Sequence, residues 1–376
     1  MNNDHPPCFT TAKRVVIKAG SGVLTEKNGL NLNVIKSISK QISILIDRGI
    51  EVILVSSGAM ASGTKKIGLL QRPVDIPGRQ AVAAVGQAGL IMEYEKNFNI
   101  HGKKVAQILL TREDLSSRKR YLNARNTLNT LLSWQVLPII NENDTVAVEE
   151  IRFGDNDNLA AMISLLLDAD LLISLTDIDG LYDSDPRSNP AARLIPVVNK
   201  ITRKTELLAS EIPGALGAGG MLSKIKAAKK VTSAGIPMVI VKGEKEDILI
   251  KLFSNEKHGT FFTPKEKKLA SRKSWIAYTI KPGGVIKIDD GAAEAIQKKG
   301  KSLLPCGIID IEGDFGVGAA VRLQAAGKIL GTGLVNYSAS DIRNIMGRKT
   351  CDILHPTGSK PYNEVVHRDN LVIISE

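Results

Sequence analysis

The chain has 376 residues, 43% of them hydrophobic and 24% charged, a length that favours two domains and a composition that supports a buried core. No apolar run reaches the roughly 18 residues of a membrane-spanning helix, and the N-terminal MNNDHPPCF lacks the apolar segment of a signal peptide. The formal net charge of +11 leaves nucleic acid as one class of partner.

The distribution of charge along the chain bears on the kind of partner, and the cysteine count bears on disulfides and metal sites. Residues 1–243 carry a net charge of +7, whereas residues 281–376 carry only +1. A positive field over the first region also attracts small anionic substrates. The three cysteines, Cys8, Cys306 and Cys351, are odd in number and far apart. We therefore expect reduced thiols in a cytoplasmic protein, with neither a disulfide framework nor a cysteine metal site.

Strand and helix signals alternate over the first 243 residues. Short apolar runs predict six buried strands: Arg14–Lys18, Glu51–Val55, Val105–Leu110, Val136–Ile140, Leu171–Leu175 and Pro237–Val241. Stretches with helical periodicity lie between them: Asn33–Arg48, Gln80–Phe98, Arg120–Leu132, Asn156–Leu167 and Met221–Ala234. This order predicts an α/β fold in which helices surround a mainly parallel sheet and ligands bind beyond the carboxyl ends of its strands.

The pattern changes after residue 243. Charged residues crowd together between Lys245 and Lys273, as in an exposed connection. From Trp275 onward, short apolar segments are punctuated by glycine and proline every 8–12 residues or so, which predicts a small β-rich domain. We therefore expect a first domain over residues 1–262, a linker over 263–274, a second domain over 275–360 and a C-terminal tail over 361–376.

Two familiar kinase classes are excluded. The sequence contains no G-x-x-x-x-G-K-[ST], so the chain is not a P-loop enzyme. The triplet His367-Arg368-Asp369 copies part of the protein-kinase catalytic loop, but no glycine-rich loop precedes it and no D-F-G follows it. Any phosphate site must therefore be built from other parts.

Two glycine-containing turns follow the first two predicted strands. In Lys18-Ala-Gly-Ser-Gly22 the glycines let backbone N–H groups approach a polyanion, and Lys18 projects into the same space. The segment Ser56-Ser57-Gly58 precedes a helix, whose N-terminal N–H groups attract phosphate or carboxylate. Both have a structural alternative, because the first can be a simple tight turn and Ser57 can be a helix cap.

Two further clusters are rich in polar residues or glycine. Asn141-Glu-Asn-Asp144-Thr and Phe153-Gly-Asp155-Asn-Asp157-Asn158 carry short amides and carboxylates, which suit the ends of an amino acid or a metal-bound phosphate better than they suit a plain solvated loop. Gly217-Ala-Gly-Gly-Met-Leu-Ser-Lys224 opens a helix with a lysine on its first turn, as in a phosphate site. The lysines further along this helix fit an exposed face.

Together these segments resemble a known family. In order, KAGSGVL, SSGA, INENDTV, FGDNDNLAA, TDIDGLY, DPRSNP and GAGGMLSK are similar to the glutamate 5-kinases of the amino-acid-kinase family. Residues 275–360, with IDDGAAEAI and SLLPCGI, resemble the PUA domain that many of these kinases carry. The resemblance implies transfer of the γ-phosphoryl group of ATP to the γ-carboxylate of L-glutamate, giving L-glutamyl 5-phosphate in the first step of proline biosynthesis.

The resemblance also implies roles for individual residues. Lys18 and Lys224 act on the transferring phosphoryl group, and Asp157 holds both lysines. Glutamate is bound by Ser57, Gly58, Asp144 and Asn156. ATP is bound by Lys18, Gly20, Gly22, Thr176, Asp177, Ala218, Gly219, Gly220, Met221, Leu222, Ser223 and Lys224. Mg²⁺ is expected to arrive with ATP, and no protein residue is assigned to it.

Several alternatives and partners stay open at this point. The chain could instead phosphorylate N-acetylglutamate or aspartate, although the INEND and GDNDN segments argue against both. RNA binding is retained only as an accessory role of the PUA domain, since that region is nearly neutral and has no basic-aromatic strip. The resemblance further implies a homo-oligomer and proline as a feedback inhibitor.

Overall fold

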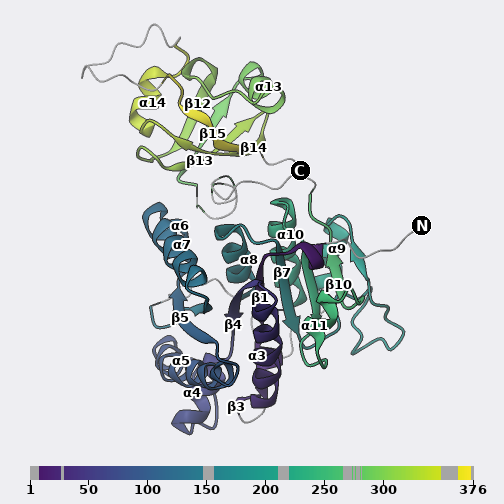
Figure 1. The fold of residues 1–376 in the computed structure, drawn as a ribbon. Coiled ribbons are helices and arrows are strands. Elements are labelled where there is room, and N and C mark those ends of the chain that lie inside the picture. The colour runs from purple at the N-terminus through teal and green to yellow at the C-terminus, as the bar shows by residue number, and fades with distance from the viewer. Residues whose placement is uncertain are drawn as a thin grey trace. The chain divides into compact units, whose positions relative to one another are not determined.

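The computed structural model describes residues 8–26, 29–146, 156–210, 220–265, 273, 276, 280, 282–348 and 363–373. The chain divides into two compact units, Met1–Lys268 and Leu269–Glu376 (Figure 1). Among the described residues, no helix combines the length and the apolar character needed to cross a membrane.

The first unit is built on an eight-stranded sheet with the order β5-β6-β4-β1-β7-β9-β10-β8. Every pairing in it is parallel except that between β9 and β10. The strands are β1 (Arg14–Ala19), β4 (Glu51–Ser56), β5 (Lys104–Leu110), β6 (Val136–Glu142), β7 (Leu171–Thr176), β8 (Val197–Val198), β9 (Met238–Lys242) and β10 (Thr260–Phe262). A small ribbon joins β2 (Thr25–Glu26) to β3 (Gly29–Leu30).

Helices cover both faces of this sheet (Figure 1). Those of the first unit are α1 (Cys8–Thr11), α2 (Ser21–Leu24), α3 (Leu32–Asp47), α4 (Ala59–Ile67), α5 (Ile76–Asn99), α6 (Arg112–Ser116), α7 (Arg118–Ser133), α8 (Asn156–Leu166), α9 (Arg203–Ser210), α10 (Met221–Ser233) and α11 (Ile248–Phe253). The expected α/β architecture, with helices around a mainly parallel sheet, is confirmed.

Alternation along the central strand decides which side chains meet which helices. Val15, Ile17 and Ala19 of β1 belong to a hydrophobic core that also contains the buried faces of α3, α5 and α11. Because successive strand residues point to opposite faces, Val16 and Lys18 lie on the other face, where α8 packs against β1 and β7. The side chain of Lys18 therefore lies on the face of the sheet that α8 covers, and not in the hydrophobic core that contains α3.

The segment expected to be an exposed connection has a buried first part. Between Lys245 and Lys273 the chain forms α11 and β10, and the side chains of Leu249, Leu252 and Phe261 are fully buried in the core of the first unit. These two elements could not be predicted from the sequence, because charged residues separate their apolar positions. A helix of six residues and a strand of three also give almost no periodicity.

The second unit contains a five-stranded sheet with the order β12-β11-β13-β14-β15 and a core of its own. Its elements are β11 (Gly284–Ile288), α13 (Asp290–Lys299), the short 3₁₀ helix η2 (Pro305–Gly307), β12 (Ile308–Gly313), β13 (Ala320–Ala325), β14 (Lys328–Val335), α14 (Ala339–Ile345) and β15 (Val366–Ile373). The expectation of a small β-rich second domain is confirmed. Residues 366–373, which we expected to belong to a C-terminal tail, form β15 and pair with β14.

Candidate active site

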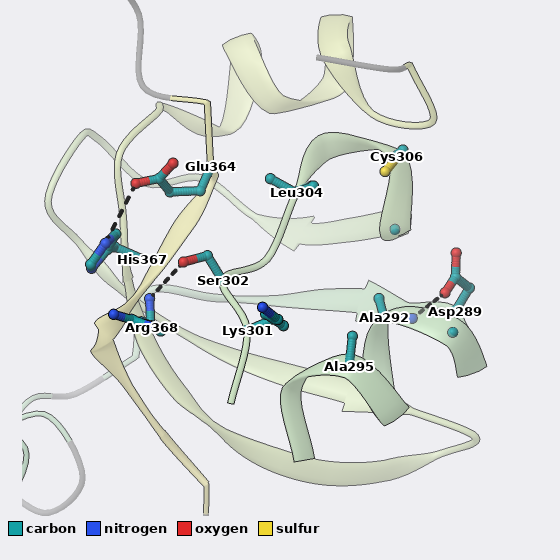
Figure 2. Close-up of a pocket in the computed structure, with 12 residues that line it drawn as sticks. Asp289, Ala292, Ala295, Lys301, Ser302, Leu304, Cys306, Glu364, His367 and Arg368 are labelled. Atoms are coloured by element: carbon teal, nitrogen blue, oxygen red, sulfur yellow. Dashed lines mark hydrogen bonds and ion pairs between the residues drawn. The ribbon is translucent and has the colours of Figure 1, made fainter. Parts of the chain in front are cut away.

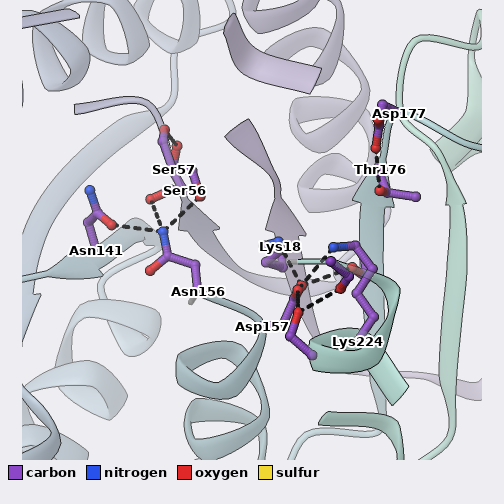
Figure 3. Close-up of polar contacts among 12 residues, drawn as sticks. Lys18, Ser56, Ser57, Asn141, Asn156, Asp157, Thr176, Asp177 and Lys224 are labelled. Atoms are coloured by element: carbon purple, nitrogen blue, oxygen red, sulfur yellow. Dashed lines mark hydrogen bonds and ion pairs between the residues drawn. The ribbon is translucent and has the colours of Figure 1, made fainter. Parts of the chain in front are cut away.

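Most of the residues singled out from the sequence lie at or just beyond the carboxyl ends of neighbouring strands in the first unit. Lys18 is near the end of β1, Ser57 follows β4, and Thr176 ends β7. The pairing of β1 with β4 and with β7 brings these ends to one edge of the sheet (Figure 3). This is the edge at which open parallel sheets bind ligands.

One carboxylate joins two lysines at this edge. Asp157, in the first turn of α8, lies 2.6 Å through Oδ1 from Lys18 Nζ and 3.1 Å through Oδ2 from Lys224 Nζ (Figure 3). Lys224 comes from the first turn of α10, which packs against α8. All three residues are buried, so two positive charges and one negative charge are held together out of water.

Two hydroxyl groups complete the surroundings of the Asp157 carboxylate. Ser223 donates to Oδ2 at 2.8 Å, and Ser174 of β7 donates to Oδ1 at 3.4 Å. Burial opposes ionisation of Asp157, but the charges of Lys18 and Lys224 and the hydrogen bonds from Lys18 and Ser223 outweigh it and lower the pKa from 3.8 to about 2. The carboxylate is therefore ionised at neutral pH and fixes the positions of both ammonium groups.

A second polar cluster lies beside the first and is centred on Asn156. Its amide nitrogen Nδ2 is 3.1 Å from the carbonyl oxygen of Ser56, 2.8 Å from Ser57 Oγ and 3.0 Å from Asn141 Oδ1 (Figure 3). Two of these atoms can only accept hydrogen bonds, so the NH₂ end of the amide must face them. Among the described residues, none donates to the opposite end, Oδ1.

The cluster around Asn156 therefore presents both kinds of hydrogen-bonding group. Asn156 Oδ1 is an acceptor, and Ser57 Oγ, which accepts from Asn156, keeps its own proton for donation. The N–H of Gly58 has no acceptor among the described residues. Asp144 lies two residues beyond β6 and is half-buried. An amino acid, with an ammonium donor and a carboxylate acceptor, matches such a set.

The glycine turn after β1 packs against the end of β7. A Cβ on Gly22 would lie 3.2 Å from Cγ of Asp177, whose Oδ1 accepts from the Thr176 hydroxyl at 3.0 Å. Gly20 donates its N–H to the carbonyl oxygen of Leu175, so this group is used within the fold. A Cβ on Gly20 would lie 3.3 Å from Lys18 Nζ, which shows that the glycine leaves room for the ammonium group.

The glycine segment before α10 is described from Gly220 onward. Gly220 is the N-terminal cap of the helix, Met221 is buried, and Leu222 and Ser223 are half-buried. The expected ATP residues Ala218 and Gly219 lie outside the described residues, as does Asp155. The structure thus brings Lys18, Asp157, Ser223 and Lys224 together, with Thr176 and Asp177 at the end of the same strand as Ser174.

Three supporting residues were missed by reasoning from the sequence. Ser174 lies in the middle of an apolar run, where alternation along β7 shows that it shares a face with Thr176 and not with the core residues. Asn141 was noted only as one member of a polar cluster. Tyr94 of α5 gave no signal at all, because its position fits the apolar face of a helix.

A cavity of about 700 Å³ lies in the second unit between α13, η2 and β15 (Figure 2). Its lining contains both basic and acidic side chains, and the two acidic ones already have partners within the unit. Asp289 Oδ1 accepts from the N–H of Ala292 at 2.6 Å, and Glu364 lies 3.8 Å from His367. Cys306 is exposed at its edge with a free thiol. The lining does not converge on one kind of ligand group, unlike the cluster in the first unit.

No metal site is apparent in the part of the chain that the structure describes. Within those residues, no group of three or more His, Cys, Asp or Glu side chains is arranged to hold a metal ion.

Comparison with known proteins agrees with this geometry. The amino acid kinase family matches residues 13–242, and the PUA domain matches residues 284–357. The glutamate 5-kinase of Syntrophus aciditrophicus is 51% identical over 375 residues, covering 100% of this chain and 97% of the relative. Those of Syntrophotalea carbinolica and Geobacter metallireducens are 49% and 50% identical, covering 97% and 96% of this chain and 98% of each relative.

A similar solved structure is the UMP kinase of Bacillus anthracis, with a TM-score of 0.47 and 16% identity over 68% of this chain and 97% of that one. The family matches and the full-length relatives, taken with a two-unit fold, decide the classification. This chain belongs to the glutamate 5-kinase group of the amino acid kinase family and carries a PUA domain after its kinase domain.

Proposed function

We propose that this protein transfers the γ-phosphoryl group of ATP to the γ-carboxylate of L-glutamate, forming L-glutamyl 5-phosphate and ADP for proline biosynthesis. The observation that carries the proposal is the buried Asp157 carboxylate that holds Lys18 and Lys224 next to the Asn156 cluster. Relatives about half identical over the whole chain are named glutamate 5-kinase, which supports this substrate.

The chemistry needs no general base. A glutamate side-chain carboxyl, with an ordinary pKa of about 4.3, is already ionised at neutral pH and can attack phosphorus directly. The obstacle is repulsion between this anion and the phosphates of ATP. The enzyme must therefore supply positive charge and exact alignment of the attacking oxygen with the bond to the leaving ADP.

Lys18 and Lys224 supply that charge. Each ammonium group has three N–H donors, so binding Asp157 is compatible with donation to phosphate oxygens. The negative charge of Asp157 neutralises one of the two lysine charges. When all three side chains are ionised, the group has a net charge of +1. Because the trio is buried, this charge is weakly screened and acts strongly on the transferring group. Mg²⁺ enters as part of the ATP substrate and neutralises phosphate charge.

The Asn156 cluster holds the amino-acid end of glutamate in this proposal. Asn156 Oδ1 and the carboxylate of Asp144 accept from the α-ammonium group, and Ser57 Oγ and the Gly58 N–H donate to the α-carboxylate. Thr176 and Asp177 contact the nucleotide on the other side of the lysines. The substrate side chain then extends from the Asn156 cluster toward Lys18 and Lys224, where its carboxylate meets the γ-phosphate.

The proposal is tested by measuring ADP release with L-glutamate, N-acetylglutamate, L-aspartate and UMP as acceptors. Turnover with L-glutamate that far exceeds the others, together with a product that hydroxylamine traps as a hydroxamate, is the expected result, because only an acyl phosphate reacts in that way. Preference for N-acetylglutamate would show that the ammonium site is wrongly assigned. Preference for L-aspartate would show that the distance from the Asn156 cluster to the lysines is too short for glutamate.

A further inference from the structure

We propose that Tyr94 is a positioning residue for the amino-acid substrate, and that its hydroxyl group acts through Ser56 to aim the Gly58 N–H at the substrate carboxylate. The inference rests on the proposed function and adds a residue that contacts no substrate. Tyr94 lies on α5 and is fully buried, with its hydroxyl oxygen 2.8 Å from Ser56 Oγ.

The position of Ser56 on its strand explains why it meets α5. Val52 and Leu54 of β4 face the core that contains the buried side chains of α5, and alternation places Ser56 on the same face. Ser56 is the last residue of β4 and is fully buried. A buried hydroxyl pair thus lies next to the turn that leads into α4.

The direction of the hydrogen bonds follows from a count of protons. Ser56 Oγ donates to the carbonyl oxygen of Ser57 at 2.9 Å, and a serine hydroxyl has one proton. Ser56 Oγ must therefore accept a hydrogen bond from the Tyr94 hydroxyl, which is the first donor in this series of hydrogen bonds. Burial raises the pKa of Tyr94 far above its ordinary value, in spite of the opposing hydrogen bond to Ser56, so this proton stays in place throughout the working pH range.

The hydrogen bonds from Tyr94 to Ser56 and from Ser56 to the Ser57 carbonyl fix the orientation of the peptide group between Ser57 and Gly58. The Ser57 carbonyl is held toward Ser56 Oγ, and in a trans peptide the following N–H points the opposite way, so the Gly58 N–H is turned away from the core. Gly58 has a φ of 111°, which only glycine adopts readily, and a Cβ there would lie 3.0 Å from Leu30. Ser57 is also held by its N–H, which donates to the carbonyl of Ala19 at 3.1 Å.

The same turn meets Asn156 from the other side. The Ser56 carbonyl and Ser57 Oγ both accept from Asn156 Nδ2, so a change in the turn also moves the amide. Tyr94 therefore supports, from the core, the two residues that the proposed function assigns to the α-carboxylate and one that it assigns to the α-ammonium. Among the residues that the structure describes, no such series of hydrogen bonds leads from Tyr94 to Thr176 and Asp177, which belong to the nucleotide half.

The test is the variant Tyr94→Phe. It keeps the ring, which packs against Phe98, so the protein is expected to fold, while Ser56 Oγ loses the donor that holds it in place toward the Ser57 carbonyl. Loss of one hydrogen bond of ordinary strength predicts a rise of roughly 3- to 10-fold in the KM for glutamate, with the KM for ATP unchanged. Calorimetric titration with glutamate alone is expected to show the same loss of affinity without turnover.

Tyr121→Phe is the matched control, because it removes another buried tyrosine hydroxyl in the same unit. Tyr121 interacts with Arg125 and Asp168, and Asp168 precedes β7, at the end of the sheet opposite to the site. Ser56→Ala removes the same link from its other end and serves if Tyr94→Phe does not fold. The double variant Tyr94→Phe/Ser56→Ala is expected to lose no more affinity than the worse single variant.

Three outcomes would overturn the inference: a glutamate KM in Tyr94→Phe no different from that of Tyr121→Phe, equal rises in both KM values, or losses that multiply in the double variant. An inactive wild-type protein on glutamate would instead overturn the proposed function. The two failures are therefore distinguished by the wild-type assay.

Discussion

Lys18 Nζ lies 2.6 Å from Asp157 Oδ1, and the two side chains are only 6% and 0% exposed. A contact this close between buried opposite charges makes the ionisation of Asp157 part of the stability of the fold. Removing the negative charge takes from Lys18 and Lys224 the buried carboxylate that they share. The same carboxylate thus stabilises the fold and positions the lysines of the site. Unfolding experiments report on the first role, and enzyme kinetics report on the second.

Acid is expected to remove the stabilising contribution of Asp157. The pKa of this residue is about 2 in the folded protein and 3.8 ordinarily, so the contribution is present above pH 3.8 and is lost as the pH falls through 2. This shift corresponds to about 2 kcal/mol in total. Urea unfolding of the wild type and of Asp157→Asn should therefore show a stability gap at pH 6 that narrows below pH 4.

Asp47→Asn provides the control for this experiment. Asp47 pairs with Lys103, but its side chain is 64% exposed, so its pair is screened by water and contributes little. Its gap to the wild type should stay near zero at both pH values. A constant gap for Asp157→Asn from pH 6 to pH 2 would mean that Asp157 titrates as an ordinary carboxyl group.

Lys224→Ala is expected to lower kcat by roughly 10²-fold or more, because it removes a fixed positive charge from the transition state. The fold should survive, since Asp157 keeps its contact with Lys18. Lys226→Ala, two residues along the same helix and exposed, is the matched control and should keep wild-type turnover. Near-native kcat in a folded Lys224→Ala protein, judged by circular dichroism, would refute the assignment.

Asp144→Ala is expected to raise the KM for glutamate much more than it lowers kcat. The substitution removes an acceptor for the substrate ammonium group, which is bound equally in the ground state and the transition state. Initial rates across a grid of glutamate and ATP concentrations separate the two KM values. A rise confined to the KM for ATP would place Asp144 in the nucleotide half of the site.

Gly22→Ala is expected to weaken ATP binding by steric displacement alone. Its new Cβ would lie 3.2 Å from Cγ of Asp177, so the carboxylate must move by a few tenths of an ångström and strain its contact with Thr176. We expect the KM for ATP to rise roughly 3- to 10-fold, the effect of losing about one hydrogen bond. Gly316→Ala, where nothing lies within 4 Å of the new carbon, should change neither KM.

The sheet and the long helices of the first unit were predictable because their burial is written in local patterns. The strand expected over Leu171–Leu175 is observed as Leu171–Thr176, and the helix expected over Asn156–Leu167 ends one residue earlier. Elements with little periodicity, such as β10 with three residues, were not predictable in this way. The partnership of β15 with β14 also depends on contacts distant in sequence.

The site divides along the same line. Lys18, Asp157 and Lys224 stand out in the sequence because charged residues close to strand ends and helix starts are unusual beside apolar runs, and the family resemblance supplied their roles. Tyr94 could not be found, since it is 38 residues from Ser56 and fits the apolar face of its helix. Only the three-dimensional arrangement shows that a core tyrosine supports the turn at Gly58.

The last prediction concerns the second unit. A chain shortened to residues 1–268 is expected to fold and to keep phosphorylating glutamate. The first unit ends at Lys268 and has a hydrophobic core of its own, to which α11 and β10 contribute Leu252 and Phe261. Every described residue of the proposed site lies within it, and a unit of this size buries enough apolar surface to fold alone. The β-rich unit has a hydrophobic core of its own, made of residues from that unit.

Regulation and assembly are the properties expected to change in the shortened chain, because an added domain can bias an oligomer or an inhibited state without entering the chemistry. We expect kcat and both KM values within about twofold of the full chain. Any inhibition of the full chain by proline, and any self-association seen by light scattering on a sizing column, are expected to differ in the shortened chain. The full chain carrying Lys301→Ala is the control, because it alters the cavity of the second unit and leaves the unit in place. A folded, inactive shortened chain would show that the second unit completes the active site, since the first unit would then hold the catalytic residues without being able to use them.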